Sequence, residues 1–135
     1  MKFLIVDDEE TVVDFFSQAA KAMGHTDIET ASTGEEALTR VIQNTYDLIT
    51  LDIRMPGVSG LEVLSPIRNM CPHAIIAVIS GHISDDFDTD LAGCADVVIR
   101  KPVDLSKLNK LLEIATRICE TIKEVHELED VPNRN

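Results

Sequence analysis

The sequence predicts a doubly wound α/β domain, in which a five-stranded parallel sheet carries helices on both faces. Its 135 residues are enough for one domain with a proper hydrophobic core. Short apolar runs alternate with amphipathic segments five times along the chain. The runs are apolar throughout, which is typical of parallel strands that are buried on both faces. Right-handed crossovers would then place helices on both sides of the sheet.

The expected strands share this continuous apolar pattern, and polar or turn residues bound each of them. Strands of parallel sheets also require a crossover between them, and the intervening segments are long enough to supply one. The five expected strands are Lys2–Val6, Asp27–Ala31, Asp47–Leu51, Ile75–Ile79 and Asp96–Ile99.

The first two helices have clear start or stop signals. Thr11–Met23 places its apolar residues on one helical face, and Gly24 follows as a stop. Ser32 and Glu35 have the spacing of a capping box and precede a second amphipathic segment.

The later helices are less uniform. We expect Ser59 to cap a third helix that runs to about Met70, with a kink at Pro66 because proline lacks the N–H and crowds the preceding turn. A fourth helix over 84–92 has a poor apolar pattern. Asp104 can cap a last helix that stays helical in pattern to about Glu129, about 39 Å at 1.5 Å per residue.

The charge balance excludes several classes of function. The chain has 12 basic and 24 acidic residues, a net charge of −12, which disfavours direct binding to nucleic acid or to anionic membranes. Its longest apolar run near the N-terminus, Phe3–Val6, is too short for a signal peptide. The chain has three cysteines, Cys71, Cys94 and Cys119, with no CxxC pair among them. This pattern indicates reduced thiols rather than a disulfide framework or a zinc site. We therefore expect a cytoplasmic protein.

Polar side chains stand where the expected strands end. Asp7 and Asp8 follow the first strand, Asp52 the third, Ser80 the fourth and Lys101 the fifth. The carboxyl ends of parallel strands meet at one edge of a sheet, so we expect these side chains to converge. Carboxylates that lie close together repel one another unless a cation neutralises their charge, and Mg²⁺ prefers hard oxygen ligands of this kind. Serine and lysine at the same point suit a phosphoryl group, so the set predicts a carboxylate that attacks phosphorus.

Residues 1 to about 120 resemble the receiver domains of two-component response regulators. That resemblance implies the (βα)5 flavodoxin-like form of the doubly wound fold, and each matching motif stands at a strand end. The motifs are Val6-Asp7-Asp8-Glu9, Leu51-Asp52-Ile53-Arg54-Met55-Pro56-Gly57 with Ser59-Gly60-Leu61, Ile79-Ser80-Gly81 and Arg100-Lys101-Pro102.

The resemblance implies a role for each acid. Asp52 would accept a phosphoryl group from a histidine kinase or a phosphotransfer protein. Asp8 and Asp52 would bind Mg²⁺ directly, with Mn²⁺ as the alternative ion, and the backbone carbonyl of Arg54 would be a third ligand. Asp7 would act mainly through a metal-bound water.

The resemblance also implies roles for the residues at the remaining strand ends. Lys101 would pair with Asp52 before phosphorylation and with a phosphoryl oxygen afterwards, and Ser80 would move to hydrogen-bond the phosphoryl group. Pro102 would follow a cis peptide bond. Many relatives carry an aromatic residue three positions before the lysine, where this chain has Val98, so we expect that aromatic switch to be missing.

Two further regions bear on partners. We expect a receiver domain over 1–120 and a helical extension with a frayed tail or linker over 121–135. The weakly patterned 84–92 segment is our candidate for a mobile output face. The last helix repeats apolar residues in 3-4 steps, which favours a coiled-coil homodimer or a lead into an effector domain. Alternatively, its first half packs on the receiver domain and its second half is a solvated extension. This apolar seam consists of Leu108, Leu111, Ala115, Ile118, Ile122 and Val125.

Two other functions remain as alternatives. A phosphohydrolase with an aspartate nucleophile would want a general acid two residues after it, where Arg54 stands. A degenerate receiver that only binds partners would not need the complete set of acids, serine and lysine. The sequence is equally compatible with a stand-alone receiver, acting through a downstream protein, and with the front end of a larger regulator.

Overall fold

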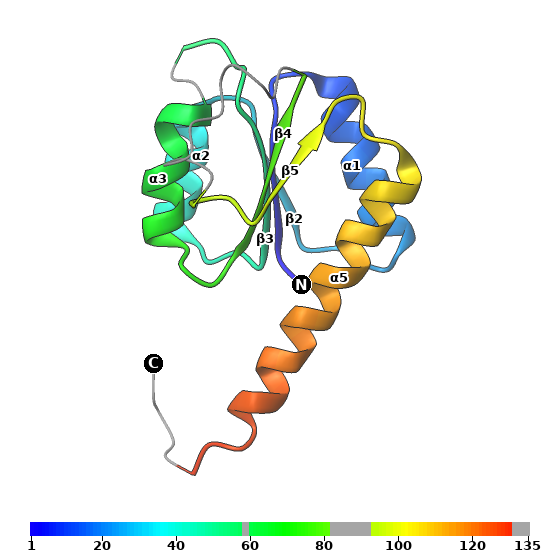
Figure 1. The fold of residues 1–135 in the computed structure, drawn as a ribbon, viewed down its shortest axis with the longest axis vertical. Coiled ribbons are helices and arrows are strands. Elements are labelled where there is room, and N and C mark those ends of the chain that lie inside the picture. Colours follow the sequence, from blue (N-terminus) through cyan, green and yellow to red (C-terminus); the bar gives the residue numbers. More distant parts are fainter. Residues whose placement is uncertain (58–59, 82–92, 131–135) are drawn as a thin grey trace.

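The computed structural model describes residues 1–57, 60–81 and 93–130. It shows a five-stranded, fully parallel sheet in the order β2-β1-β3-β4-β5, which confirms the predicted fold class (Figure 1). The expected Ser59 cap and the expected helix over 84–92 lie outside the described residues. The strands are β1 (Phe3–Val6), β2 (Ile28–Ala31), β3 (Leu48–Asp52), β4 (Ile75–Ser80) and β5 (Val97–Arg100).

Helices cover both faces of the sheet. In Figure 1, α1 and α5 lie on one side and α2 and α3 on the other. Alternate residues of β1 enter two different cores, Leu4 and Val6 on the α2–α3 side and Phe3 and Ile5 on the α1–α5 side, which is why the run is apolar throughout. The helices are α1 (Glu10–Ala22), α2 (Gly34–Gln43), α3 (Gly60–Met70) and α5 (Leu105–His126).

The end of α1 follows the predicted stop signal. Gly24 has a φ of +91°, a left-handed conformation that glycine adopts without steric cost. The N–H of Gly24 donates to the carbonyl of Lys21 at 2.9 Å, and that of His25 donates to the carbonyl of Ala20 at 3.0 Å. This pair of bonds is a Schellman motif, and it satisfies carbonyls that the helix end would otherwise leave unpaired.

The capping box of α2 lies one residue later than predicted. Thr33, not Ser32, is the N-cap, and its hydroxyl accepts from the N–H of Glu36 at 3.1 Å. The Glu36 carboxylate in turn accepts from the N–H of Ser32 at 3.1 Å, so Glu36 takes the place predicted for Glu35. Both frames contain a hydroxyl residue followed three positions later by glutamate, so the pattern alone does not distinguish them.

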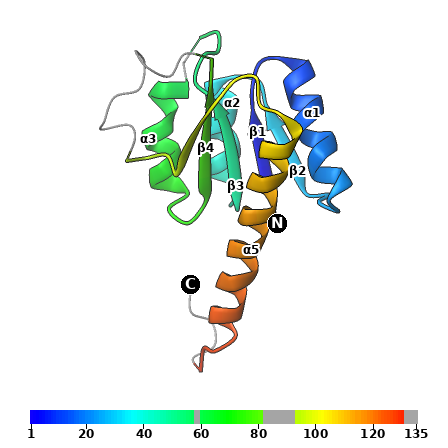
Figure 2. The same ribbon diagram turned by 45° about the vertical axis from the view of Figure 1, so that its right-hand side comes forward.

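The last helix extends past the end of the sheet, as Figures 1 and 2 both show. Asp104 caps α5 as predicted, because its side chain accepts from the N–H of Lys107 at 2.7 Å. The helix has 22 residues, about 33 Å, and ends at His126 rather than near Glu129. Its buried side chains all lie in its first half, and they are Leu108, Leu112 and Ala115.

The apolar seam of α5 lies in two environments, as in the alternative in which the first half of the helix packs on the receiver domain and the second half extends from it. Leu108 and Ala115 are packed against their own domain, whereas Ile118, Ile122 and Val125 are exposed. The heptad spacing continues across a change of environment, from a domain core to an open surface. The exposed large apolar side chains of α5 are Leu105 and Ile114 in its first half and Ile118, Ile122 and Val125 in its distal half, residues 116–126.

Candidate functional site

The candidate site lies at the topological switch point of the sheet. The chain leaves β1 for β2 on one side and returns to β3 on the other, so the carboxyl ends of β1 and β3 flank the switch. Val6 pairs with Leu51, which places the next residues, Asp7 and Asp52, side by side. Ligands of doubly wound sheets bind at such a point.

Asp52 is the last residue of β3, and its side chain is 3% exposed. Its Oδ1 accepts from the N–H of Arg54 at 3.0 Å, and its Oδ2 lies 3.2 Å from the Nζ of Lys101. The start of α3 lies against this strand end, since the N–H of Gly60 donates to the carbonyl of Ile53 at 3.3 Å. A Cβ on Gly60 would stand 2.3 Å from the Asp52 carbonyl oxygen, so only glycine permits this approach.

Asp7 has the same arrangement on the other side of the switch point. It is also 3% exposed, its Oδ1 accepts from the N–H of Glu9 at 2.8 Å, and its Oδ2 lies 3.1 Å from the Nζ of Lys101. Each buried carboxylate thus gives one oxygen to a backbone N–H and the other to Lys101. This shared pattern fixes both carboxylates with their second oxygens turned to the same ammonium.

Lys101 reaches both acids from the end of β5. Its N–H donates to the carbonyl of Ser80 at 2.8 Å, and the Lys101–Pro102 peptide bond is cis, as the resemblance implied. Its side chain is 20% exposed, so the ammonium lies between the buried acids and solvent. A third carboxylate, that of Glu9, lies 3.5 Å from the same Nζ.

Burial controls the charge of these groups. It raises the pKa of Asp52 to about 6; the N–H of Arg54 and the Lys101 ammonium oppose this rise, and the charge of Asp7 adds to it. Burial likewise raises the pKa of Asp7, against the N–H of Glu9 and against Lys101. Burial acts to lower the pKa of Lys101, but the hydrogen bonds and charges of Asp7 and Asp52 outweigh it, and that pKa is raised. One ammonium therefore does not fully compensate two buried carboxylates.

The remaining predicted residues lie at the same edge. Ser80 ends β4, is fully buried, and pairs with Arg100, the residue before Lys101. Asp8 is exposed beside Asp7. Arg54 is held to Asp52 by its N–H, while the use of its carbonyl as a metal ligand stays a prediction.

The acids at this edge form a group that could hold a metal ion. Each of Asp7, Asp8, Glu9 and Asp52 offers a carboxylate oxygen, and these oxygens lie within 4.8 Å of one another. The donors are all hard oxygens, and two of the acids are buried with incompletely compensated charge. Both properties fit Mg²⁺, which prefers a few carboxylates together with water.

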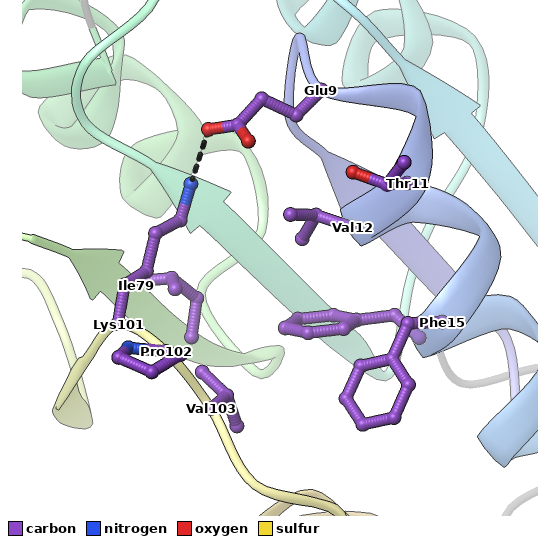
Figure 3. A pocket seen from close by; sticks show the side chains of 9 residues that line it. Glu9, Thr11, Val12, Phe15, Ile79, Lys101, Pro102 and Val103 are labelled. Atoms are coloured by element: carbon purple, nitrogen blue, oxygen red, sulfur yellow. Dashed lines mark hydrogen bonds and ion pairs between the residues drawn. The ribbon is translucent and has the colours of Figure 1, made fainter.

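An apolar cavity of about 490 Å³ opens beside this cluster, between α1 and the residues that follow β5. Figure 3 shows the ammonium of Lys101 and the carboxylate of Glu9 at one side of it, with apolar side chains on the other. Those apolar side chains include Val12, Phe15 and Val103. The cavity thus gives an apolar surface directly next to the charged site.

The sequence predicts which strand ends meet, but it does not predict the parts that two residues play there. The position of Glu9 directly after the aspartate pair puts it among the acids at or beside the site, without assigning it a contact or a role. Gly60 belongs to a matching motif, likewise without a role, and the spacing of a glycine at the start of a helix was its signal. Neither the contact of Glu9 with Lys101 nor the close approach of Gly60 to Asp52 follows from local pattern.

A parallel α/β sheet with paired acids and a lysine at its switch point defines a class of domains whose carboxylates act on a charged ligand. Within that class, the chain belongs to the family of response regulator receiver domains, whose sequence model matches residues 3–113. The predicted family is therefore confirmed. It is a family of signalling proteins that are phosphorylated on aspartate and relay a signal.

Similar proteins agree with this assignment. The transcriptional regulatory protein YvrH of Bacillus subtilis is 34% identical over 124 residues, which cover 92% of this chain and 50% of that protein. The response regulator TrrA of Thermotoga maritima, solved in complex with Mg²⁺ and BeF, is 34% identical with a TM-score of 0.75 and covers 85% of this chain and 99% of that one. NtrX of Brucella abortus, solved in complex with ATP, is 28% identical with a TM-score of 0.78 and covers 98% of this chain and 31% of that one.

The chain spans about half the length of the curated relatives it matches. Across its described residues, none of the helices is long and apolar enough to cross a membrane. Its three cysteines are free thiols.

Proposed function

We propose that this domain accepts a phosphoryl group on Asp52 and changes its affinity for a partner as a result. The observation that carries the proposal is the environment of the Asp52 carboxylate, which is buried and holds its Oδ2 against the Lys101 ammonium. The family relationship supports a histidine kinase or a phosphotransfer protein as the donor.

In the proposed reaction, Asp52 is the nucleophile. A carboxylate oxygen of Asp52 forms a bond to phosphorus while the bond from phosphorus to the donor's histidine nitrogen breaks, and the imidazole leaves with that electron pair. Lys101 stays within reach of the oxygens on which negative charge accumulates. The Ser80 hydroxyl, at the end of the neighbouring strand, would move to donate a hydrogen bond to the transferred group.

Asp8, Asp52 and the carbonyl of Arg54 would hold Mg²⁺ directly, and Asp7 would act through water. When bound, the ion would neutralise the phosphoryl oxygens. Mn²⁺ offers the same preference for oxygen ligands, and parallel titrations with the two ions would rank them. Raised pKa values at Asp7 and Asp52 support the need for additional positive charge here.

We infer that the domain catalyses its own phosphorylation and dephosphorylation but is not a metabolic enzyme. A phosphohydrolase that used Asp52 would want an acid two residues later, and Arg54 stands there with its N–H bonded to Asp52. Of the acids that do lie nearby, Asp7 and Glu9 are in contact with Lys101, and Asp8 belongs to the group that could hold a metal ion. A cytoplasmic location and the absence of direct nucleic-acid or membrane binding by this domain remain part of the proposal.

We divide the chain into a receiver domain over 1–120 and an extension over 121–135. The exposed distal half of α5 supports pairing with a second copy of the chain through Ile118, Ile122 and Val125. A link to an effector domain of the same protein would use the same helix. The segment 84–92, our candidate output face, lies outside the described residues.

Intact mass after incubation with a small phosphodonor and Mg²⁺ tests the proposed reaction. One added phosphoryl group on the wild-type chain, absent from Asp52→Asn, is the expected result. Asp47→Asn, which changes the residue just before β3 and thus at the opposite edge of the sheet, is the control and should retain the adduct. Absence of any adduct would point to a binding module, and steady consumption of the donor without an adduct would point to an enzyme.

A further inference from the structure

Glu9 occupies the solvent side of the lysine that the proposed reaction uses. Its Oε1 lies 3.5 Å from the Nζ of Lys101, the same ammonium that contacts Asp7 at 3.1 Å and Asp52 at 3.2 Å. The Glu9 side chain is 58% exposed, against 3% for each of the two aspartates. Figure 3 shows the Glu9 carboxylate directed at the ammonium beside the apolar cavity.

The backbone around Glu9 fixes this placement. Its N–H donates to Asp7 at 2.8 Å, and its carbonyl accepts from the N–H groups of Val12 and Val13, each at 3.1 Å. Glu9 is the N-cap of α1, yet its side chain makes no capping hydrogen bond. The carboxylate is therefore held at the ammonium of Lys101 instead of at the helix end.

This carboxylate places a negative charge at the entrance to the site. Among the residues that line the cavity in the described part of the chain, Glu9 and Lys101 are the charged ones. Exposed ion pairs contribute little to folding stability, so stability does not explain the arrangement. A charge at an entrance does change how readily other charged molecules arrive.

We propose that Glu9 determines which phosphodonors the domain accepts, and this inference rests on the phosphoacceptor function proposed above. The Glu9 carboxylate disfavours small anionic donors that arrive free in solution. A protein donor is less affected, because it brings its phosphoryl group together with side chains that can pack on the cavity's apolar wall. Glu9 is thus a specificity residue that acts through charge.

Charge discrimination has a specific signature. Coulomb repulsion from one carboxylate is twice as large for a dianion as for a monoanion at the same distance. In a water-like medium at about 8 Å, removing one charge corresponds to roughly twofold faster reaction of a monoanion and about fivefold faster reaction of a dianion. At about 1 M salt the Debye length falls to about 3 Å, so most of this difference should vanish.

The experiment compares acetyl phosphate, a dianion at neutral pH, with phosphoramidate, a monoanion. Initial rates of adduct formation at low ionic strength would be measured by intact mass on the full chain with saturating Mg²⁺. Glu9→Gln should accelerate the reaction about fivefold with acetyl phosphate and about twofold with phosphoramidate. Glu9→Asp keeps the charge and should preserve the wild-type ratio of the two rates. Glu10→Gln, which removes the same charge one residue along, is the matched control and should change that ratio much less.

Three results would overturn the inference. Equal acceleration of both donors by Glu9→Gln would exclude a charge effect, as would an identical response of Glu10→Gln. Slower reaction together with weaker Mg²⁺ binding would make Glu9 a metal ligand instead. An adduct that is missing from the wild-type chain, or that persists in Asp52→Asn, would instead reject the phosphoacceptor function itself.

Discussion

The carboxyl edge of the sheet and the distal half of α5 depart from the usual distribution of residues in opposite directions. The first buries charge, with the Asp7 and Asp52 side chains 3% exposed. The second exposes apolar surface, with Ile118 41% and Ile122 40% exposed. Folding alone favours neither arrangement, because buried charge and exposed apolar surface both cost free energy.

The two regions differ in how closely their side chains define the chemistry of a ligand. At the carboxyl edge, Asp7, Asp52 and Lys101 converge within about one hydrogen-bond length, so charge and geometry together support the proposed cation and phosphoryl group. Along α5, apolar side chains repeat without any polar group that would orient a partner. A convergent polar site therefore defines a ligand class, whereas an apolar stripe defines only a shape.

The largest expected effect is at the carboxyl edge. Lys101→Ala leaves two buried carboxylates without their ammonium and removes the charge that would stabilise the transferred phosphoryl group. We expect the initial rate of phosphorylation to fall about a hundredfold or more, measured by intact mass with excess donor. Lys110→Ala, which removes an exposed lysine paired with Glu113 on α5, is the control. A rate for Lys101→Ala close to that of Lys110→Ala would contradict the role of Lys101.

The second effect is steric. In Gly60→Ala the new Cβ would stand 2.3 Å from the Asp52 carbonyl oxygen and 2.6 Å from the Ile53 Cα, both backbone atoms that cannot easily move. We expect the free energy of unfolding to drop by about 3 kcal/mol in urea titrations and phosphorylation to slow. Gly81→Ala introduces a Cβ with nothing within 4 Å and should stay within about 0.5 kcal/mol of wild type. Equal stabilities of the two variants would show that α3 can shift without cost.

The third effect concerns buried charge. Because the pKa of Asp52 is about 6 in the fold, above its ordinary 3.8, the folded state binds more protons than the unfolded state between these values. Stability of the metal-free protein should therefore fall as pH rises through this interval and stay lower above it. Asp52→Asn should remove this loss and stabilise the metal-free protein by about 2 kcal/mol at pH 7.5.

Thermal unfolding in a chelator, repeated from pH 4 to pH 8, checks the third effect. Asp14→Asn, an exposed acid on α1, provides the control and should follow the wild-type pH dependence. Added Mg²⁺ should stabilise wild type and not Asp52→Asn. A pH profile that is the same for wild type and Asp52→Asn would mean that the buried carboxylate is already fully compensated.

Most of the fold could be predicted from the sequence because a strand that is buried on both faces consists of a continuous run of apolar residues. Leu4 and Ile5 face opposite cores, so every residue of β1 must be apolar. The same holds for most positions of the central strands β3 and β4, although Thr50 within β3 is buried as well. Strand ends were predictable for the same reason, since Asp7 and Asp52 interrupt apolar runs. The exact start of a helix was harder to predict, because Ser32 and Thr33 both fit the same N-capping pattern.

The parts of the site that the sequence did not predict depend on three-dimensional contacts. Glu9 contacts Lys101 across 92 positions of sequence, which requires the relative placement of α1 and β5. The role of Gly60 depends on how closely the start of α3 approaches the end of β3. The division of the apolar seam also depends on such contacts: heptad spacing does not say whether a residue faces its own domain, as Leu108 does, or solvent, as Ile118 does.

The smallest effect on folding is expected in the distal half of α5. Because the domain's own core covers Leu108, Leu112 and Ala115, the double substitution Ile118→Ser with Ile122→Ser should change the free energy of unfolding of the monomer by less than about 0.5 kcal/mol. Leu112→Ala, on the covered half of the same helix, should instead cost about 3 kcal/mol.

The same substitutions should affect self-association in the opposite order: the double substitution should abolish it, whereas Leu112→Ala should not. The distal half of α5 has about three turns, and so small an apolar area supports at most weak, concentration-dependent pairing. Sedimentation should show dimers of the wild-type chain at tens to hundreds of micromolar and only monomers of the double variant, while Leu112→Ala should still pair when folded. A wild-type monomer at high concentration, unchanged by truncation after Ile118, would reject the homodimer. The solvated extension and the link to an effector domain would then remain, because neither needs a second copy to cover Ile118 and Ile122.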